Sequence, residues 1–295
     1  MAVAITLILN GIANSALYFL MSAGLTLIFG LLRIINFAHG GIYLWGAYVA
    51  VFLYSVTHQF AVALVGGIAA GLVLGWLTER LLRSAEEKGQ HGSASEGSNQ
   101  LLLTMGALIV LDEAVTMTFG RDPINASAPS LLSHSFLFGS LVIVVYQLLV
   151  IVIGIVVYVA LQILLRRSRL GMVIRAGVYN RELVEARGIP IRRVFMWTFI
   201  LGAALAGFAG ALAGPYFGSV TPEMGMDMQL NAFIIVVLGG LGSLSGSLAG
   251  SLLIGVATAL VSYFAPSLAV LVNVLLMAGV LMFRPNGLLG ERGVA

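Results

Sequence analysis

The sequence predicts an all-α membrane protein, a polytopic bundle of about eight transmembrane helices. Of the 295 residues, 60% are hydrophobic and 9% are charged, and the mean hydropathy is +1.04. Soluble domains carry about 25% charged residues, so this chain has too little charge to cover a water-facing surface. Long apolar stretches recur along it, and 36 glycines suit membrane helices that pack closely.

The apolar stretches predict the order of the spans, and polar residues at 83–100 and 120–135 indicate aqueous loops. Glycines interrupt the stretch 229–262, which therefore forms either two segments or a re-entrant half-helix followed by a helix. We expect broken or re-entrant segments near 33–41 and 239–243, within a single domain, 1–295. The predicted spans are 4–32, 42–57, 60–82, 101–119, 137–165, 194–217, the interrupted 229–262 and 267–283.

Charge predicts the orientation. Eight arginines lie in the loop 166–193, so this loop is expected in the cytoplasm. Counting spans from there places residue 33, the loop 83–100 and the C-terminus inside, and the N-terminus outside. The arginines flank apolar spans, which explains the net charge of +3 without nucleic-acid binding. Cysteine is absent, and the four histidines lack metal-ligand spacing, so no metal site is expected.

Two interruptions are candidate elements of a translocation pathway, because irregular backbone at membrane depth is tolerated only where it is buried in protein or lines a cavity. The first contains Asn36, His39 and Gly40; the alternative is an ordinary cytoplasmic turn. The second contains Gly239, Gly240 and Gly242, and Asn231 precedes it in the same apolar stretch.

Asp112 and Glu113 lie near the centre of the fourth predicted span. Acidic groups there are costly unless they are buried, paired or protonated, so this pair marks a pathway or subunit-contact site. Arg33, Arg121 or a residue of another chain is the candidate partner. The alternative is that the span boundary lies elsewhere and the pair sits near the membrane interface.

Small residues recur at every fourth position in two stretches, which predicts close helix packing, and a role in helix movement stays open. They are Gly202, Ala206, Gly210 and Gly214, and then Gly246 and Gly250 after Gly242. Ser245 lies in a Gly-Ser-Leu-Ser-Gly segment, but nothing places a histidine base beside it. The chain also lacks a phosphate-binding loop and so is expected to hydrolyse no ATP itself.

The basic loop contains a candidate docking helix. Asn180 is a plausible N-cap, residues 181–187 can form a short helix, and Gly188 with Pro190 ends it. A solvated basic loop is the alternative.

Four stretches of the sequence resemble the H-type permeases of branched-chain amino acid ABC importers, a family that includes urea and amide permeases. They are 23–30 (AGLTLIFG) running into 35–40 (INFAHG); Gly171-Met172, Arg175-Ala176 and 185–189 (EARGI); 202–214 continuing to 237–243 (VLGGLGS); and 284–290 (RPNGLLG). Each motif alone is weak, but the four occur in order over nearly the whole chain.

The resemblance implies a bacterial inner-membrane subunit, surrounded by lipid, that forms half of a pathway working by alternating access. It implies three kinds of partner: a second, M-type permease, two cytoplasmic ATPases that bind the ATP, and a periplasmic substrate-binding protein. The chain itself would hold no cofactor and would not be an enzyme. An ATPase-independent transporter or channel, or an importer of urea or amides, is the alternative.

The resemblance also assigns the loop 166–193 to ATPase coupling. The residues expected to take part are Arg175, Asn180, Glu182, Glu185, Ala186, Arg187 and Gly188. The family pattern has Glu-Ala-Ala before the glycine, whereas this chain has Glu185-Ala186-Arg187.

Overall fold

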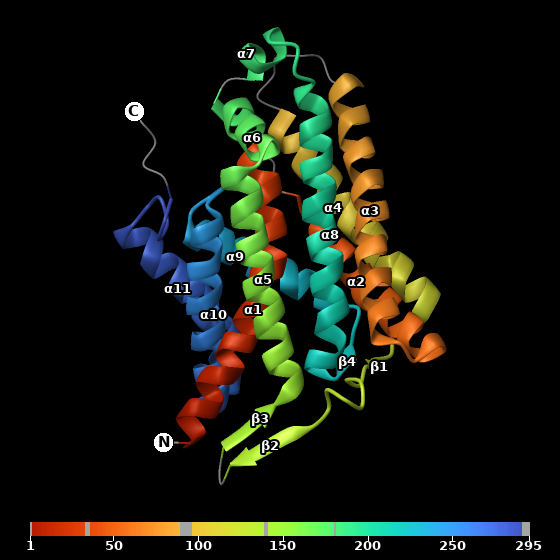
Figure 1. Cartoon of the computed structure of the whole chain (residues 1–295), viewed down its shortest axis with the longest axis vertical. Helices are drawn as coiled ribbons and strands as arrows, with labels where there is room; N and C mark the ends of the chain where they lie inside the picture. Colours follow the sequence, from red (N-terminus) through yellow and green to blue (C-terminus); the bar gives the residue numbers. More distant parts are fainter. Residues whose placement is uncertain (1, 33–35, 89–95, 139–140, 180, 291–295) are drawn as a thin grey trace.

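The computed structural model describes residues 2–32, 36–88, 96–138, 141–179 and 181–290. These residues form a helical bundle with short strands at one end (Figure 1). The helices are α1 (Ala2–Leu32), α2 (Ala38–Thr57), α3 (Phe60–Lys88), α4 (Glu96–Phe119), α5 (Val145–Arg167), α6 (Arg169–Tyr179), α7 (Arg181–Ala186), α8 (Ile191–Phe217), α9 (Met224–Gly239), α10 (Leu244–Phe264) and α11 (Ala269–Phe283), with a 3-10 turn, η1, at Pro266–Leu268. The strands are β1 (Ile124–Asn125), β2 (Ser135–Phe138), β3 (Leu141–Val144) and β4 (Ser219–Val220).

Seven helices in the described part of the chain are long and apolar enough to cross a membrane: α1, α2, α3, α4, α5, α8 and α10. Two apolar helices are shorter, α9 and the part of α11 from Leu271 to Phe283. The all-α polytopic fold is therefore confirmed. The predicted re-entrant region resolves into α9 and α10, joined by a turn at Gly240–Ser243.

Two ends of the bundle are distinct in Figure 1. The C-terminal end of α3 lies with α6 and α7 at the top, and the start of α1 lies with the strands at the bottom. Segments that parity counting assigns to one side of the membrane therefore lie at one end of the molecule.

Helix α8 occupies the centre and packs against α1, α2 and α3. Its small residues permit this. A side chain on Gly202 would lie 2.7 Å from the carbonyl oxygen of Gly24 in α1, and one on Gly210 would collide with the carbonyl of Tyr43 in α2. Ala206 is fully buried between these two positions. With so little bulk at the interface, the helix backbones approach closely and gain van der Waals contact, which drives helix association in lipid.

Three predicted boundaries are wrong. The predicted loop 83–100 is largely helical, because α3 continues to Lys88 and α4 begins at Glu96. Polar residues there extend the helices beyond the apolar stretch, so hydropathy underestimates their length. The first break is also shorter than 33–41: α2 begins at Ala38, and His39 and Gly40 lie in its first turn.

The fifth span begins later than predicted. Residues 137 and 138 belong to β2, and residues 141–144 form β3, which pairs antiparallel with β2. The helix α5 starts only at Val145. Hydropathy cannot separate these states, since Val142, Ile143 and Val144 are apolar but β-branched, and such residues favour strands.

Candidate functional site

The beginnings of α2 and α9 meet in the interior of the bundle. Side chains on Gly40 and Gly225 would each press on the other's backbone, with the Gly40 Cβ 2.5 Å from the carbonyl oxygen of Gly225. Phe37 stacks on Phe233 with ring centroids 6.4 Å apart. Helix α2 has neither an acidic residue in its first turn nor a side-chain cap. The helix itself therefore supplies no group that would offset the partial positive charge of its N-terminus.

His39 lies between three helices and is fully buried. Its Nε2 is 3.2 Å from the carbonyl oxygen of Met21 in α1. A Cβ on Gly24 would lie 2.9 Å from the imidazole and would also collide with the carbonyl oxygen of Gly202 in α8. Gly24 is thus needed for the histidine to fit, and Gly202 for α1 and α8 to approach each other.

Gln229 completes the cluster from α9. Its Nε2 donates to the backbone oxygen of Asn36 at 3.3 Å. Both Gln229 and Asn36 are fully buried. Among the described residues, several side-chain atoms here have no hydrogen-bond partner: both polar atoms of Asn36, Nδ1 of His39, Oε1 of Gln229 and the hydroxyl of Tyr43.

Leaving a buried polar atom without a partner costs about 1–3 kcal/mol, and polar groups within membrane helices mark functional sites by default. We call Asn36, His39, Tyr43 and Gln229 the buried polar cluster. Sequence reasoning predicted Asn36, His39 and Gly40. It missed Gln229, whose position beside Asn36 depends on how α9 packs against α2, and Tyr43, which follows His39 by four positions on α2.

Asp112 and Glu113 lie apart from this cluster, on α4. Glu113 faces Arg121 with the nearest charged atoms 3.7 Å apart, and both side chains are exposed. Asp112 is half-buried and has Glu223 as an electrostatic neighbour. Of the two partners suggested from this chain, Arg121 pairs with Glu113, and Arg33 lies outside the described residues. Glu223 precedes α9 and gives no sequence signal of its proximity to α4.

The turn between α9 and α10 depends on glycine. Gly240 and Gly242 have φ angles of 106° and 83°, which side-chain-bearing residues rarely adopt. A side chain on Gly239 would collide with Gly246, and one on Gly250 would lie 2.9 Å from the carbonyl oxygen of Ile235. Ser243 accepts a hydrogen bond from the Gly246 amide at 3.1 Å and so caps the start of α10.

The segment 284–290 holds this turn from outside. The amides of Leu288 and Leu289 donate to the carbonyls of Leu238 and Gly239 at 2.8 and 3.0 Å, and so satisfy the end of α9. Deeper in the bundle, Asn231 accepts a hydrogen bond from Asn273 of α11 at 2.9 Å. Asn231 thus joins helices on the α9–α11 side and does not reach Asn36 or His39 in any hydrogen bond described for it.

The basic loop folds into α6 and α7, which lie at the top of the bundle in Figure 1. Ile174, Val184, Ile191 and Phe195 form a small buried core there. Helix α7 covers Arg181–Ala186. Gly188 follows it with a φ of 78°, and its amide donates a hydrogen bond to the carbonyl of Glu185, which terminates the helix. Arg175 donates to the carbonyl of Leu165, while Glu185, Ala186 and Arg187 are exposed. Asn180 lies outside the described residues, as does the side chain of Glu182.

A family model described as "Branched-chain amino acid transport system / permease component" matches residues 7–283. The chain belongs to this family. The permease is 31% identical to the branched-chain amino acid permease protein LivH of Escherichia coli K12, over 96% of this chain and 94% of LivH. It is 32% identical to BraD of Pseudomonas aeruginosa, over 96% and 95% of the two chains.

A solved structure supports the fold. The permease matches a chain of PsaBC from Streptococcus pneumoniae, determined with a Fab, with a TM-score of 0.51 and 13% identity. The match covers 93% of the permease and 89% of that chain, so the shared helical architecture extends over nearly the whole molecule. The predicted membership of the branched-chain amino acid permeases is confirmed, and the permease is a multi-pass transport component.

Proposed function

We propose that this permease forms half of the translocation pathway of an ATP-driven importer of branched-chain amino acids. The observation that carries the proposal is the buried polar cluster, in a chain whose family model spans residues 7–283. A second, M-type permease supplies the other half. Two cytoplasmic ATPases and an extracytoplasmic binding protein complete the system.

The chemistry of the cluster suits an amino-acid substrate. Such a substrate carries a carboxylate, an ammonium group and an apolar side chain. The start of α2 has no acidic residue and no side-chain cap, so its partial positive charge favours a negative group such as the carboxylate. The carbonyl of Asn36 and the free Oε1 of Gln229 are acceptors for an ammonium group. We therefore assign Asn36, His39 and Gln229 to a pathway that is closed in this conformation and opens during alternating access.

Helices α6 and α7 are the proposed contact with the ATPases. They lie at one end of the bundle, and a small buried core joins them to the start of α8, so a movement of α6 and α7 would be passed to that central helix. The basic residues gathered at this end favour the cytoplasmic side. ATP binding on the partner subunits would then displace α6 and α7, and the bundle would reorient around the pathway.

Reconstitution tests the proposal. The permease, its second permease, the ATPases and the binding protein are placed in proteoliposomes, and uptake of labelled leucine is measured with and without ATP. Uptake that requires both ATP and loaded binding protein supports the importer. Uptake by the permease alone without ATP would contradict it, and uptake of urea in place of leucine would reassign the substrate.

Variants of the cluster test the pathway itself. We expect Asn36→Ala and His39→Ala to lower leucine uptake about tenfold, because losing one polar partner in a buried site costs roughly 1.4 kcal/mol. His134→Ala is the matched control, since His134 is exposed in the loop before β2. Normal uptake by both cluster variants at normal abundance would remove these residues from the pathway.

A further inference from the structure

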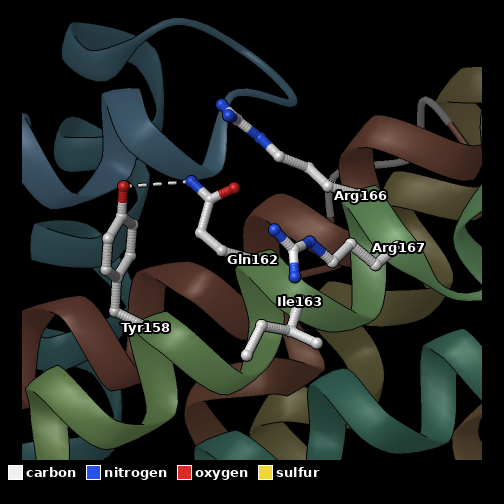
Figure 2. Close-up of a pocket in the computed structure, with 5 residues that line it drawn as sticks. All are labelled: Tyr158, Gln162, Ile163, Arg166 and Arg167. Carbon is white, nitrogen blue, oxygen red and sulfur yellow. Dashed lines mark hydrogen bonds between the residues drawn. The ribbon is translucent and has the colours of Figure 1, made fainter.

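A cavity of about 420 Å³ lies against the last turns of α5. It is lined by Tyr158, Gln162, Ile163, Arg166 and Arg167, all from this helix (Figure 2). No predicted pathway or packing residue lines it, and Arg166 and Arg167 are the first two residues of the loop 166–193. The cavity opens near the end of α5, where the membrane-spanning segment gives way to the basic loop.

The polar wall of the cavity is ordered. The Gln162 amide nitrogen donates to the Tyr158 hydroxyl at 3.0 Å, as Figure 2 shows, and to the Ser245 hydroxyl at 2.9 Å. These bonds connect α5 with the first turn of α10. Tyr158 is fixed further by an edge contact with Phe19 of α1, with ring centroids 5.7 Å apart. The wall is therefore preformed.

The two arginines are available to a ligand. Arg166 and Arg167 are exposed, and neither forms an ion pair with a described residue. Two carbonyls near the end of α5 accept hydrogen bonds from other side chains and not from these arginines. Ser168 donates to the carbonyl of Leu164, and Arg175 donates to that of Leu165. Two guanidinium groups with free donors form a strong site for a phosphate group.

An apolar stripe continues from the cavity along the same face of α5. Val152, Val156, Val159 and Ile163 follow at helical spacing and are 56%, 59%, 47% and 54% exposed. This stripe leads from the arginines towards membrane depth. A ligand that matches both parts has an anionic head and a hydrocarbon chain.

We propose that this cavity binds the headgroup phosphate of an anionic phospholipid, with an acyl chain along the stripe of α5. Basic pockets between membrane helices recognise such headgroups. The site is independent of the solute that the permease transports. A soluble anion would match the arginines but not the stripe, and an acidic protein surface would match the arginines but would not require the exposed apolar stripe beside them.

Native mass spectrometry of the permease, purified with its associated subunits, tests the site by titration with phosphatidylglycerol. We expect Arg166→Gln/Arg167→Gln to weaken phosphatidylglycerol binding about thirtyfold, as expected for two arginine–headgroup contacts. Arg166→Lys/Arg167→Lys keeps the charge and should retain most of the binding. Phosphatidylcholine, whose phosphate charge is offset by the choline cation, should bind more weakly and depend less on the two arginines.

The matched control is Arg192→Gln/Arg193→Gln, which removes two exposed charges at the start of α8, outside the cavity. It should leave phosphatidylglycerol binding unchanged. Unchanged binding in the cavity variant, or an equal loss in the control, would overturn the proposal. Displacement of the lipid by inorganic phosphate would point to a soluble anion instead. Loss of a partner subunit with lipid still bound would point to a protein contact.

Discussion

Gln229 lies in an apolar helix and makes one hydrogen bond through its amide nitrogen, while its Oε1 has no partner among the described residues. A group in this state lowers the stability of the closed conformation. We infer that Gln229 acts in another conformation, in which the buried polar cluster is hydrated or binds substrate. Stability and transport are therefore expected to respond in opposite directions when it is replaced.

The variant Gln229→Leu tests this opposition. Removing the unsatisfied Oε1 relieves roughly 1–3 kcal/mol of desolvation cost, so we expect an unchanged or higher unfolding temperature together with lower leucine uptake. Thermal unfolding in detergent and uptake in proteoliposomes measure the two effects. If stability and uptake fell together, Gln229 would act as an ordinary structural residue.

Gly24 permits the contact among α1, α8 and His39. Gly24→Ala places a methyl group against the backbone carbonyl of Gly202, which cannot rotate away. We expect a loss of about 1–3 kcal/mol in the free energy of unfolding, as for other overpacked sites. Gly279→Ala in α11 is the control, because its Cβ meets no atom within 4 Å. An equal effect of both substitutions on unfolding would contradict the close contact.

At the scale of the helix, α7 ends at Gly188, which has space for a side chain but a φ of 78°. Gly188→Ala therefore introduces strain of about 1–2 kcal/mol through the backbone alone. We expect ATPase activity to respond less to loaded binding protein, while the unfolding temperature of the bundle stays the same.

Gly106→Ala in α4 serves as the control for Gly188→Ala, since Gly106 also has no atom within 4 Å but lies within a regular helix. If loaded binding protein stimulated the ATPase activity of the Gly188→Ala variant as strongly as that of the native permease, the end of α7 would have no role in ATPase coupling.

The elements differ in how well the sequence predicts them. Apolar length defines α1, α2 and α8 to within a few residues, because the bilayer imposes that length, whereas the division of 229–262 into α9 and α10 stayed open. The β2–β3 hairpin was missed, since β-branched apolar residues are read as part of the next span. The polar cluster was predicted only on α2, where Asn36 and His39 interrupt an apolar stretch. Gln229 is a single polar residue in such a stretch, and only tertiary packing brings it to Asn36.

In the molecule as a whole, basic residues are unequally distributed between the two ends of the bundle. Most described basic residues lie at the end of α3 or between the end of α5 and the start of α8, whereas Arg121 follows α4 and Arg284 follows α11. The positive-inside rule then predicts that α6 and α7 lie on the cytoplasmic side.

Single cysteines test this orientation, because the native chain contains none and so gives no background. Ser84 near the end of α3 and Ser130 in the loop before β2 are both exposed. We expect a membrane-impermeant maleimide to label Ser130→Cys in intact cells, and Ser84→Cys only after the membrane is opened. The reverse labelling pattern would show the opposite orientation of the permease, in which α6 and α7 could not contact cytoplasmic ATPases.

The hydrogen bonds from Leu288 and Leu289 to the end of α9 also bear on how the protein is made. The carbonyls of Leu238 and Gly239 accept hydrogen bonds from amides that are synthesised about fifty positions later. These two hydrogen bonds therefore form only after residues 288 and 289 have been synthesised. A chain cut short before residue 288 would leave the carbonyls of Leu238 and Gly239 without these partners.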